Sequence, residues 1–117
     1  MTVTKNTGIL GENMAAEVLI QKGYLIRERN YRYKRSEIDI IAEKDGILVF
    51  IEVKTRKSIR FGFPEEFVSE KKAEMVITAA EQYIYETEWK KDIRFDIVSI
   101  VMNKNGSEIQ HFEDAFF

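Results

Sequence analysis

The stretch "SEIDIIAEKDGILVFIEVKTR", residues 36–56, contains two apolar runs on either side of an Asp-Gly pair. Runs of Ile, Val, Leu and Phe are typical of strands, and Asp-Gly between two such runs is a strong signal for a β-hairpin. Charged side chains nevertheless interrupt both runs. They are Asp39 in the first run and Glu52 and Lys54 in the second. Burying these charges in a sheet would be unfavourable unless they are paired with one another or with a bound ion.

Hairpin geometry brings the two carboxylates together. Side chains alternate between the faces of a strand, so Glu52 and Lys54 share one face. A two-residue turn at the Asp-Gly pair would place Asp39 opposite Glu52, and Glu37 opposite Lys54. A four-residue loop would move the register by one pair but leave Asp39 on that same face. We therefore expect Asp39 and Glu52 to converge in either case.

Converging carboxylates are typical of a metal site. Like charges opposite each other destabilise a strand pair, whereas a hard cation such as Mg²⁺ or Mn²⁺ would turn the repulsion into coordination. Lys54 would then lie beside the metal's water, and could orient it or, with a lowered pKa, deprotonate it. In the alternative interpretation Glu52 and Lys54 merely end a strand in solvent, and Glu37 pairs with Lys54. The presence of Asp39 favours the metal site.

Glu12 is a third acidic candidate. On the helix predicted for residues 8–22 it falls between Ala16 and Leu19, inside the apolar arc, whereas Glu17 points away. A carboxylate that faces the core needs a partner, and the metal could serve, directly or through water. Otherwise Glu12 would only complement the helix dipole.

The remaining patterns predict one domain of 117 residues, with residues 1–7 flexible. Its fold class is α/β, more closely α+β, with a mixed sheet flanked by helices. A loop over residues 55–68 holds the only proline, Ser69 is the expected N-cap of the second helix, and an Asn-Gly turn is expected at 105 and 106. The order is helix 8–22, strands 24–33, 37–43 and 47–54, helix 70–86, and strands 93–102 and 107–117.

Composition favours a cytoplasmic protein with a polyanionic partner. The chain has no cysteine, and its first residues lack the apolar stretch of a signal peptide or membrane anchor. The net charge is only −2, but residues 22–60 carry eleven Lys or Arg against six Asp or Glu, and residues 61–117 carry six against twelve. The basic middle could bind nucleic-acid phosphates. Its candidates are Arg27, Arg29, Arg32, Lys34, Arg35, Arg56, Lys57 and Arg60.

Several motifs resemble the YraN-like family of predicted endonucleases. They are "GENMAAEVLIQKGY", "RNYR", "SEIDIIA", "VFIEVKTR", "FG" followed by Pro64, Lys72 with "AAEQYI" after it, and "RFDIV", together spanning about residues 8–101. That family looks like a member of the PD-(D/E)XK nuclease superfamily, with a restriction-endonuclease-like core, and is similar to archaeal Holliday-junction resolvases in its helix-one glutamate. Two positions depart from the pattern, Ile38 in place of the proline and Ser36 in place of a glycine.

The resemblance implies catalytic residues Asp39, Glu52 and Lys54, with Glu12 as the helix-one acid and Glu37 in an outer or lysine-pairing role. Asp39, Glu52 and Glu12 would be the metal ligands for Mg²⁺ or Mn²⁺. The implied function is a metal-dependent endonuclease that hydrolyses phosphodiester bonds in nucleic acid, DNA favoured over RNA, branched or structured DNA included. A homodimer is a candidate assembly. The alternative is a non-catalytic nucleic-acid-binding module of the same fold.

Overall fold

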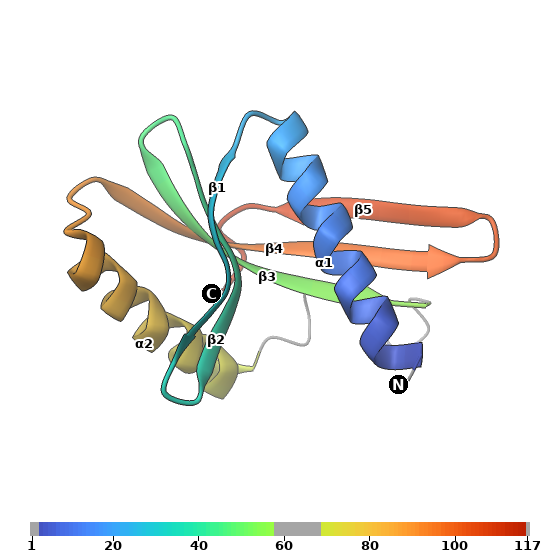
Figure 1. The fold of residues 1–117 in the computed structure, drawn as a ribbon, viewed down its shortest axis with the longest axis horizontal. Coiled ribbons are helices and arrows are strands. Elements are labelled where there is room, and N and C mark those ends of the chain that lie inside the picture. Colours follow the sequence, from blue (N-terminus) through green and yellow to red (C-terminus); the bar gives the residue numbers. More distant parts are fainter. Residues whose placement is uncertain (1–2, 58–68, 117) are drawn as a thin grey trace.

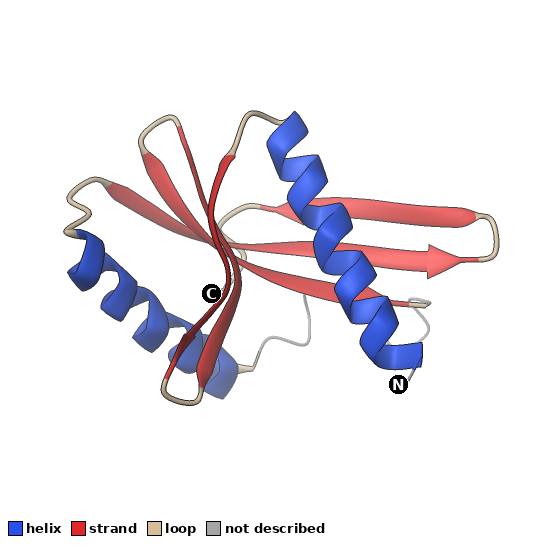
Figure 2. Ribbon diagram, in the orientation of Figure 1, coloured by secondary structure: helices blue, strands red, loops and turns tan. Residues whose placement is uncertain are grey.

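The computed structural model describes residues 3–57 and 69–116 of the chain. Two helices and five strands follow one another in the predicted order (Figures 1 and 2). The elements are α1 (Val3–Gln21), β1 (Leu25–Tyr33), β2 (Ser36–Lys44), β3 (Ile47–Arg56), α2 (Glu70–Thr87), β4 (Asp92–Asn103) and β5 (Gly106–Phe112). The predicted α+β class is confirmed.

The five strands form one mixed sheet in the order β1-β2-β3-β4-β5. β3 and β4 are parallel and the other neighbours are antiparallel, because the connection from β3 to β4 passes through α2. Helices α1 and α2 lie on opposite faces of this sheet (Figure 1). Among the described residues, no helix is both long and apolar enough to cross a membrane.

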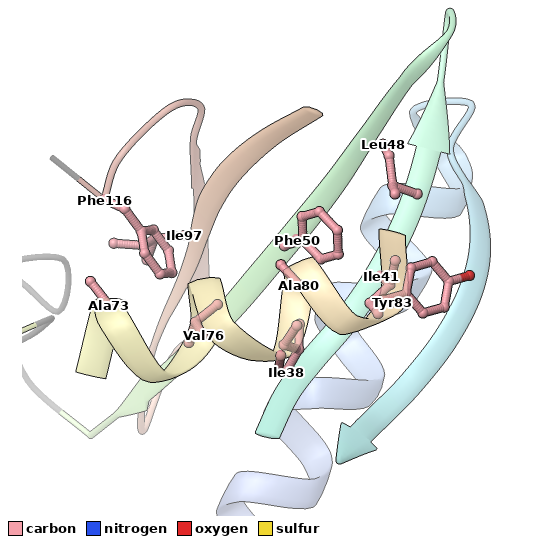
Figure 3. Packing of buried hydrophobic residues seen from close by; sticks show 11 residues of the cluster. Ile38, Ile41, Leu48, Phe50, Ala73, Val76, Ala80, Tyr83, Ile97 and Phe116 are labelled. Atoms are coloured by element: carbon pink, nitrogen blue, oxygen red, sulfur yellow. The ribbon is translucent and has the colours of Figure 1, made fainter. Parts of the chain in front are cut away.

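The alternation of β3 builds a separate core under each helix. Leu48 and Phe50 pack in the cluster beneath α2, shown in Figure 3, whereas Val49 and Ile51 pack in the cluster beneath α1. Helix α2 adds a stripe of small and aromatic side chains to its cluster, and Ser69 caps its first turn by accepting a hydrogen bond from the Lys72 N–H at 3.1 Å. The predicted N-cap is confirmed.

The β2–β3 hairpin has the two-residue turn predicted for it. Lys44 lies opposite Ile47, and the ladder continues as far as the pair Ile40 and Ile51. The next pair would be Asp39 with Glu52, but the backbone ladder between β2 and β3 ends before it. Beyond this point the two strands separate, β2 running toward the β1–β2 turn and β3 toward the end of the β4–β5 hairpin (Figure 1).

Alternation breaks at Asp39. Ile38 and Ile40 are two residues apart and would share a face of a regular strand, yet Ile38 packs beneath α2 and Ile40 beneath α1. On the neighbouring strand, Asn30 has a left-handed backbone with φ 55°, which Asn tolerates better than most residues. The β1–β2 register skips both Asn30 and Asp39. The irregularity turns the Asp39 side chain toward the gap between β2 and β3.

Three predicted boundaries were wrong. The first helix begins at Val3 rather than residue 8, because helical hydrogen bonds continue without apolar periodicity. The turn between β4 and β5 is Lys104–Asn105 rather than 105 and 106, because Asn103 pairs with Gly106. Part of the predicted loop, Thr55 and Arg56, continues β3.

Residues 58–68, which include Arg60 and Pro64, lie outside the described residues, as do the first two of the seven residues predicted to be flexible.

The last strand also ends earlier than predicted, at Phe112. Asp114 has a left-handed backbone with φ 53°, which ends the regular strand, although the N–H of Ala115 still donates to Phe95 O of β4 at 2.9 Å. The Asp114 N–H donates to Asp96 Oδ1 at 2.9 Å, and the buried Asp96 also binds Arg94 and His111. Arg94 in turn donates to the Tyr24 hydroxyl. One buried carboxylate therefore ties β4, β5 and the C-terminal tail together, and through Arg94 the start of β1 as well.

Helix α1 approaches β3 closely at Gly11. A Cβ added to Gly11 would overlap Thr55 Oγ1, whereas one added to Gly8 would meet nothing. The absent side chain lets the helix backbone reach the strand segment that follows Lys54. Glu12, the next residue, is thereby carried to the separated end of β2 and β3.

We predict that Gly11→Ala destabilises the protein by roughly 1–3 kcal/mol, because overpacking at Thr55 outweighs the better helix propensity of Ala. Gly8→Ala, on the same helix in open space, should be neutral or slightly stabilising. Chemical denaturation of the two variants measures the difference. Adding Thr55→Ala to Gly11→Ala should recover most of the lost free energy of unfolding. Equal losses in Gly11→Ala and Gly8→Ala would contradict the close approach of α1 to β3.

Candidate active site

Asp39 lies where β2 and β3 separate. Its Oδ2 accepts a hydrogen bond from the Val53 N–H at 2.7 Å, so a side chain serves as acceptor for β3 beyond the last ladder pair. The bond fixes the Asp39 carboxyl between the two strands. It also leaves Oδ1 for another partner, since a carboxylate has two oxygens.

Glu52 is a buried carboxylate with an uneven environment. Its side chain is 7% exposed, and its Oε1 lies 3.6 Å from the Nζ atoms of both Lys54 and Lys72. Among the described residues, Glu52 Oε2 is the one buried side-chain oxygen or nitrogen that has no hydrogen-bond partner. Buried polar atoms are normally satisfied, and an exception is a place to look for a ligand.

Burial and charge both act on Asp39. Burial of the carboxyl, reinforced by the negative charge of Glu52, raises the pKa of Asp39 to about 7, although the hydrogen bond from Val53 opposes the shift. The charge of Glu12 acts in the same direction as Glu52, and that of Lys72 acts against it. Glu12, Glu52 and Lys72 therefore all lie within electrostatic reach of Asp39, although the four residues come from four separate elements.

Glu12 stands apart from the other two acids. Its Oε1 accepts hydrogen bonds from Asn30 Nδ2 at 2.9 Å and from Arg29 at 3.2 Å. Arg29 also donates to Asn13 at 2.7 Å. The left-handed backbone at Asn30 allows consecutive side chains of β1 to reach the same helix. Glu12 Oε1 therefore has two side-chain partners from β1, and its role as a metal ligand stays a prediction.

The donor set fits a hard divalent cation held by two carboxylates. In residues 3–57 and 69–116, no three Asp, Glu, His or Cys side chains gather closely enough to hold an ion between them. Mg²⁺ needs no such cage, since it retains several waters and is often bound through one or two carboxylates plus a phosphate. Asp39 and the unpartnered Oε2 of Glu52 would supply the two protein oxygens.

Glu37 does not pair with Lys54, contrary to the simple register. Its Oε2 lies 2.9 Å from Arg32 on β1, its neighbour in the β1–β2 ladder. Because β2 and β3 have separated at this point, Lys54 pairs instead with Glu52, on its own strand. The side-chain partner of Glu37 is therefore on β1 and is not a member of the pair formed by Asp39 and Glu52.

The predicted nucleic-acid residues fall into three groups. Arg27 and Arg29 are bound internally, to Glu43 and Glu12 respectively. Arg32, Lys34 and Arg35 are exposed around the β1–β2 turn. Arg56 is the last residue of β3, and Lys57 follows it. Lys57 and Lys104 line a shared hollow. The second and third groups flank the two strand ends that part at Asp39.

The family model that matches the chain is described as the uncharacterised protein family UPF0102, and it covers residues 11–100. The chain belongs to the UPF0102 family. The matched residues include Glu12, Asp39, Glu52, Lys54 and Lys72.

Curated UPF0102 relatives match over nearly their whole length. The UPF0102 protein of Flavobacterium psychrophilum is 42% identical over 117 residues, covering 100% of this chain and 98% of the relative. The protein of Flavobacterium johnsoniae is 48% identical over 114 residues, covering 94% and 93%. The protein of Syntrophomonas wolfei is 43% identical over 115 residues, covering 97% and 100%.

Lys72 is the residue of this UPF0102 chain whose place beside Glu52 sequence reasoning missed. The signal was available, because Lys72 lies on the same helical stripe as Val76, Ala79 and Tyr83, which are buried. A lysine on a core-facing stripe needs a partner, as does Glu12 on α1. Which carboxylate it meets could not be read from spacing, because that depends on how α2 packs across the sheet.

We predict that Asp39→Asn makes the UPF0102 chain more stable at pH 8. The unfolded carboxyl loses its proton near pH 4, whereas the folded one holds it until about pH 7. The free energy of unfolding should therefore fall as pH rises through that window, because the native state binds the extra proton. Asn can still accept from Val53 without the buried charge, so the gain at pH 8 should be on the order of 1–4 kcal/mol.

Denaturation of wild type and Asp39→Asn from pH 4 to pH 8 measures this difference. Glu43→Gln, a half-exposed carboxylate on the same strand, is the control and should follow the wild-type pH dependence. Parallel curves for wild type and Asp39→Asn would contradict the raised pKa.

Proposed function

We propose that this protein is a metal-dependent nuclease that hydrolyses phosphodiester bonds in nucleic acid. The observation that supports it most is the buried, unpartnered Oε2 of Glu52 near the half-buried Asp39, whose pKa is raised by burial and by the charge of Glu52. Two acids that repel each other away from bulk water lower stability unless another group compensates for their charge. A hard cation with oxygen ligands would provide it.

Each side chain has a distinct role in the proposed reaction. Asp39 and Glu52 hold the cation, Asp39 with its position set by the Val53 N–H. Lys54, 3.6 Å from Glu52 and 23% exposed, reaches the solvent edge of the site, where it can orient the attacking water. When bound, Mg²⁺ or Mn²⁺ would polarise a phosphate oxygen and neutralise charge that develops during hydrolysis.

The surroundings of the site suit a polyanionic substrate. Arg32, Lys34 and Arg35 at the β1–β2 turn and Lys57 after β3 are exposed, and such cationic groups position a phosphate backbone without reading its sequence. DNA is the favoured substrate. Branched DNA is included, because one arm could contact the β1–β2 turn and another the end of β3. Residues 3–57 and 69–116 hold one such carboxylate pair, so cutting both strands of a duplex at one place with this pair would take two copies.

The alternative is a nucleic-acid-binding module of the same fold that does not cut. The same surface lysines and arginines would serve it. A binding module gains nothing, however, from keeping the buried Glu52 near Asp39 with one of its oxygens unpartnered. That feature favours hydrolysis over binding alone.

We predict that wild-type protein cuts at least one of duplex, junction or single-stranded DNA, or RNA, in Mg²⁺ or Mn²⁺. Asp39→Asn, Glu52→Gln and Lys54→Met should each lower the rate about 100-fold or more, a loss of several kcal/mol of transition-state stabilisation. Glu43→Gln serves as the matched control and should cut like wild type. Product formation on a denaturing gel gives the rates, and thermal melting confirms that each variant folds.

Two results would contradict the proposal. Cutting that survives all three substitutions would assign the activity to another protein or site. Wild-type protein that binds these substrates but cuts none of them in either cation would favour the binding module.

A further inference from the structure

Lys72 reaches the carboxylate pair from the helix side. It lies in the first turn of α2, and its Nζ is 3.6 Å from Glu52 Oε1, the same distance as Lys54 Nζ. Its side chain is 38% exposed, compared with 23% for Lys54 and 7% for Glu52. Lys72 therefore spans from the buried carboxylate to the surface.

The ion pair between Lys72 and Glu52 is a loose one. A charge-assisted hydrogen bond between an ammonium and a carboxylate is about 2.7–2.9 Å long, and 3.6 Å is clearly longer. Two ammonium groups share one oxygen, while the other oxygen of Glu52 has no partner. A lysine has a long flexible stem, so Lys72 can turn away from Glu52 without any movement of the backbone.

The two sides of the site differ in how their charges are balanced. On the α1 side, Glu12 is held by Arg29 and Asn30. On the α2 side, the ammonium group of Lys72 lies near Glu52, and its positive charge also acts on Asp39. Arg29 balances the charge of Glu12, whereas two lysines share one oxygen of Glu52, so an anionic phosphate would be attracted to the α2 side.

We propose that Lys72 is a positioning residue that binds a phosphate of the substrate once a divalent cation neutralises Glu52. This inference rests on the proposed function, since it needs the cation to be held by Asp39 and Glu52. Without the cation, Lys72 helps to neutralise Glu52. With the cation, Glu52 no longer needs two lysines, and Lys72 turns to a backbone phosphate on the α2 side while Lys54 stays with the water.

The test compares Lys72→Gln with Lys71→Gln, the adjacent exposed lysine of the same turn. Binding of a labelled DNA duplex is measured by anisotropy over a range of salt concentrations, with Ca²⁺ and without any divalent cation, and gels confirm that the DNA stays uncut. With Ca²⁺, Lys72→Gln should bind about 3- to 10-fold more weakly, and the slope of log K against log salt should fall by about 1. Without divalent cations it should match wild type.

Two variants separate a phosphate contact from a structural effect. Lys72→Arg keeps the positive charge and should restore the wild-type slope, whereas Lys71→Gln should change neither slope nor affinity in a cation-dependent way. In cleavage assays Lys72→Gln should raise KM with little effect on kcat, whereas Lys54→Met should lower kcat. Equal losses with and without Ca²⁺, or equal losses at Lys71 and Lys72, would overturn the inference.

Failure of the proposed function would look different. If wild type cuts no substrate but Lys72→Gln still shows the Ca²⁺-dependent loss of binding, hydrolysis is overturned and the phosphate contact of Lys72 stands. If wild type binds no nucleic acid in either condition, both proposals are overturned.

Discussion

The hydrogen bond from the Val53 N–H to Asp39 Oδ2 is the constraint on which the candidate site depends. It joins β2 and β3 at the place where their backbone ladder has ended, so the strands can separate without leaving this β3 donor unsatisfied. Three charged side chains act on the Asp39 carboxyl at this place. They are Glu52 of β3, Glu12 of α1 and Lys72 of α2. In a regular hairpin the backbone ladder would continue here, and Asp39 would not accept from the Val53 N–H.

The site is maintained at a cost in stability. Burial of Asp39 disfavours its charged form, and the buried Glu52 has two lysines near Oε1 but no partner for Oε2. Elsewhere the polar core is well satisfied. Asp96, which is fully buried, is bound by Arg94, His111 and the Asp114 N–H. The contrast between the two buried acids places the unsatisfied one at the site where function is proposed.

Much of the fold could be predicted because its strands and helices follow simple periodicities. The Asp-Gly turn set the β2–β3 register, and the alternation of β3 assigned Phe50 and Glu52 to one face. The prediction failed where a single backbone angle overrode the pattern. The left-handed Asn30 and the irregular step at Asp39 cannot be seen in a period of two, and they decide which residues meet Glu12. The same separation of strands explains why Glu37 pairs with Arg32 and not with Lys54.

The central claim is that Asp39 and Glu52 together bind a hard divalent cation. Crystals grown or soaked with Mn²⁺ would test it most directly, because the anomalous scattering of manganese locates the ion independently of the protein. The account predicts an anomalous peak between Asp39 and Glu52 Oε2, at about 2.0–2.6 Å from an oxygen of each, the range for hard cations bound by oxygen. A well-ordered site with no peak at saturating Mn²⁺, or with its peak on other residues, would contradict it.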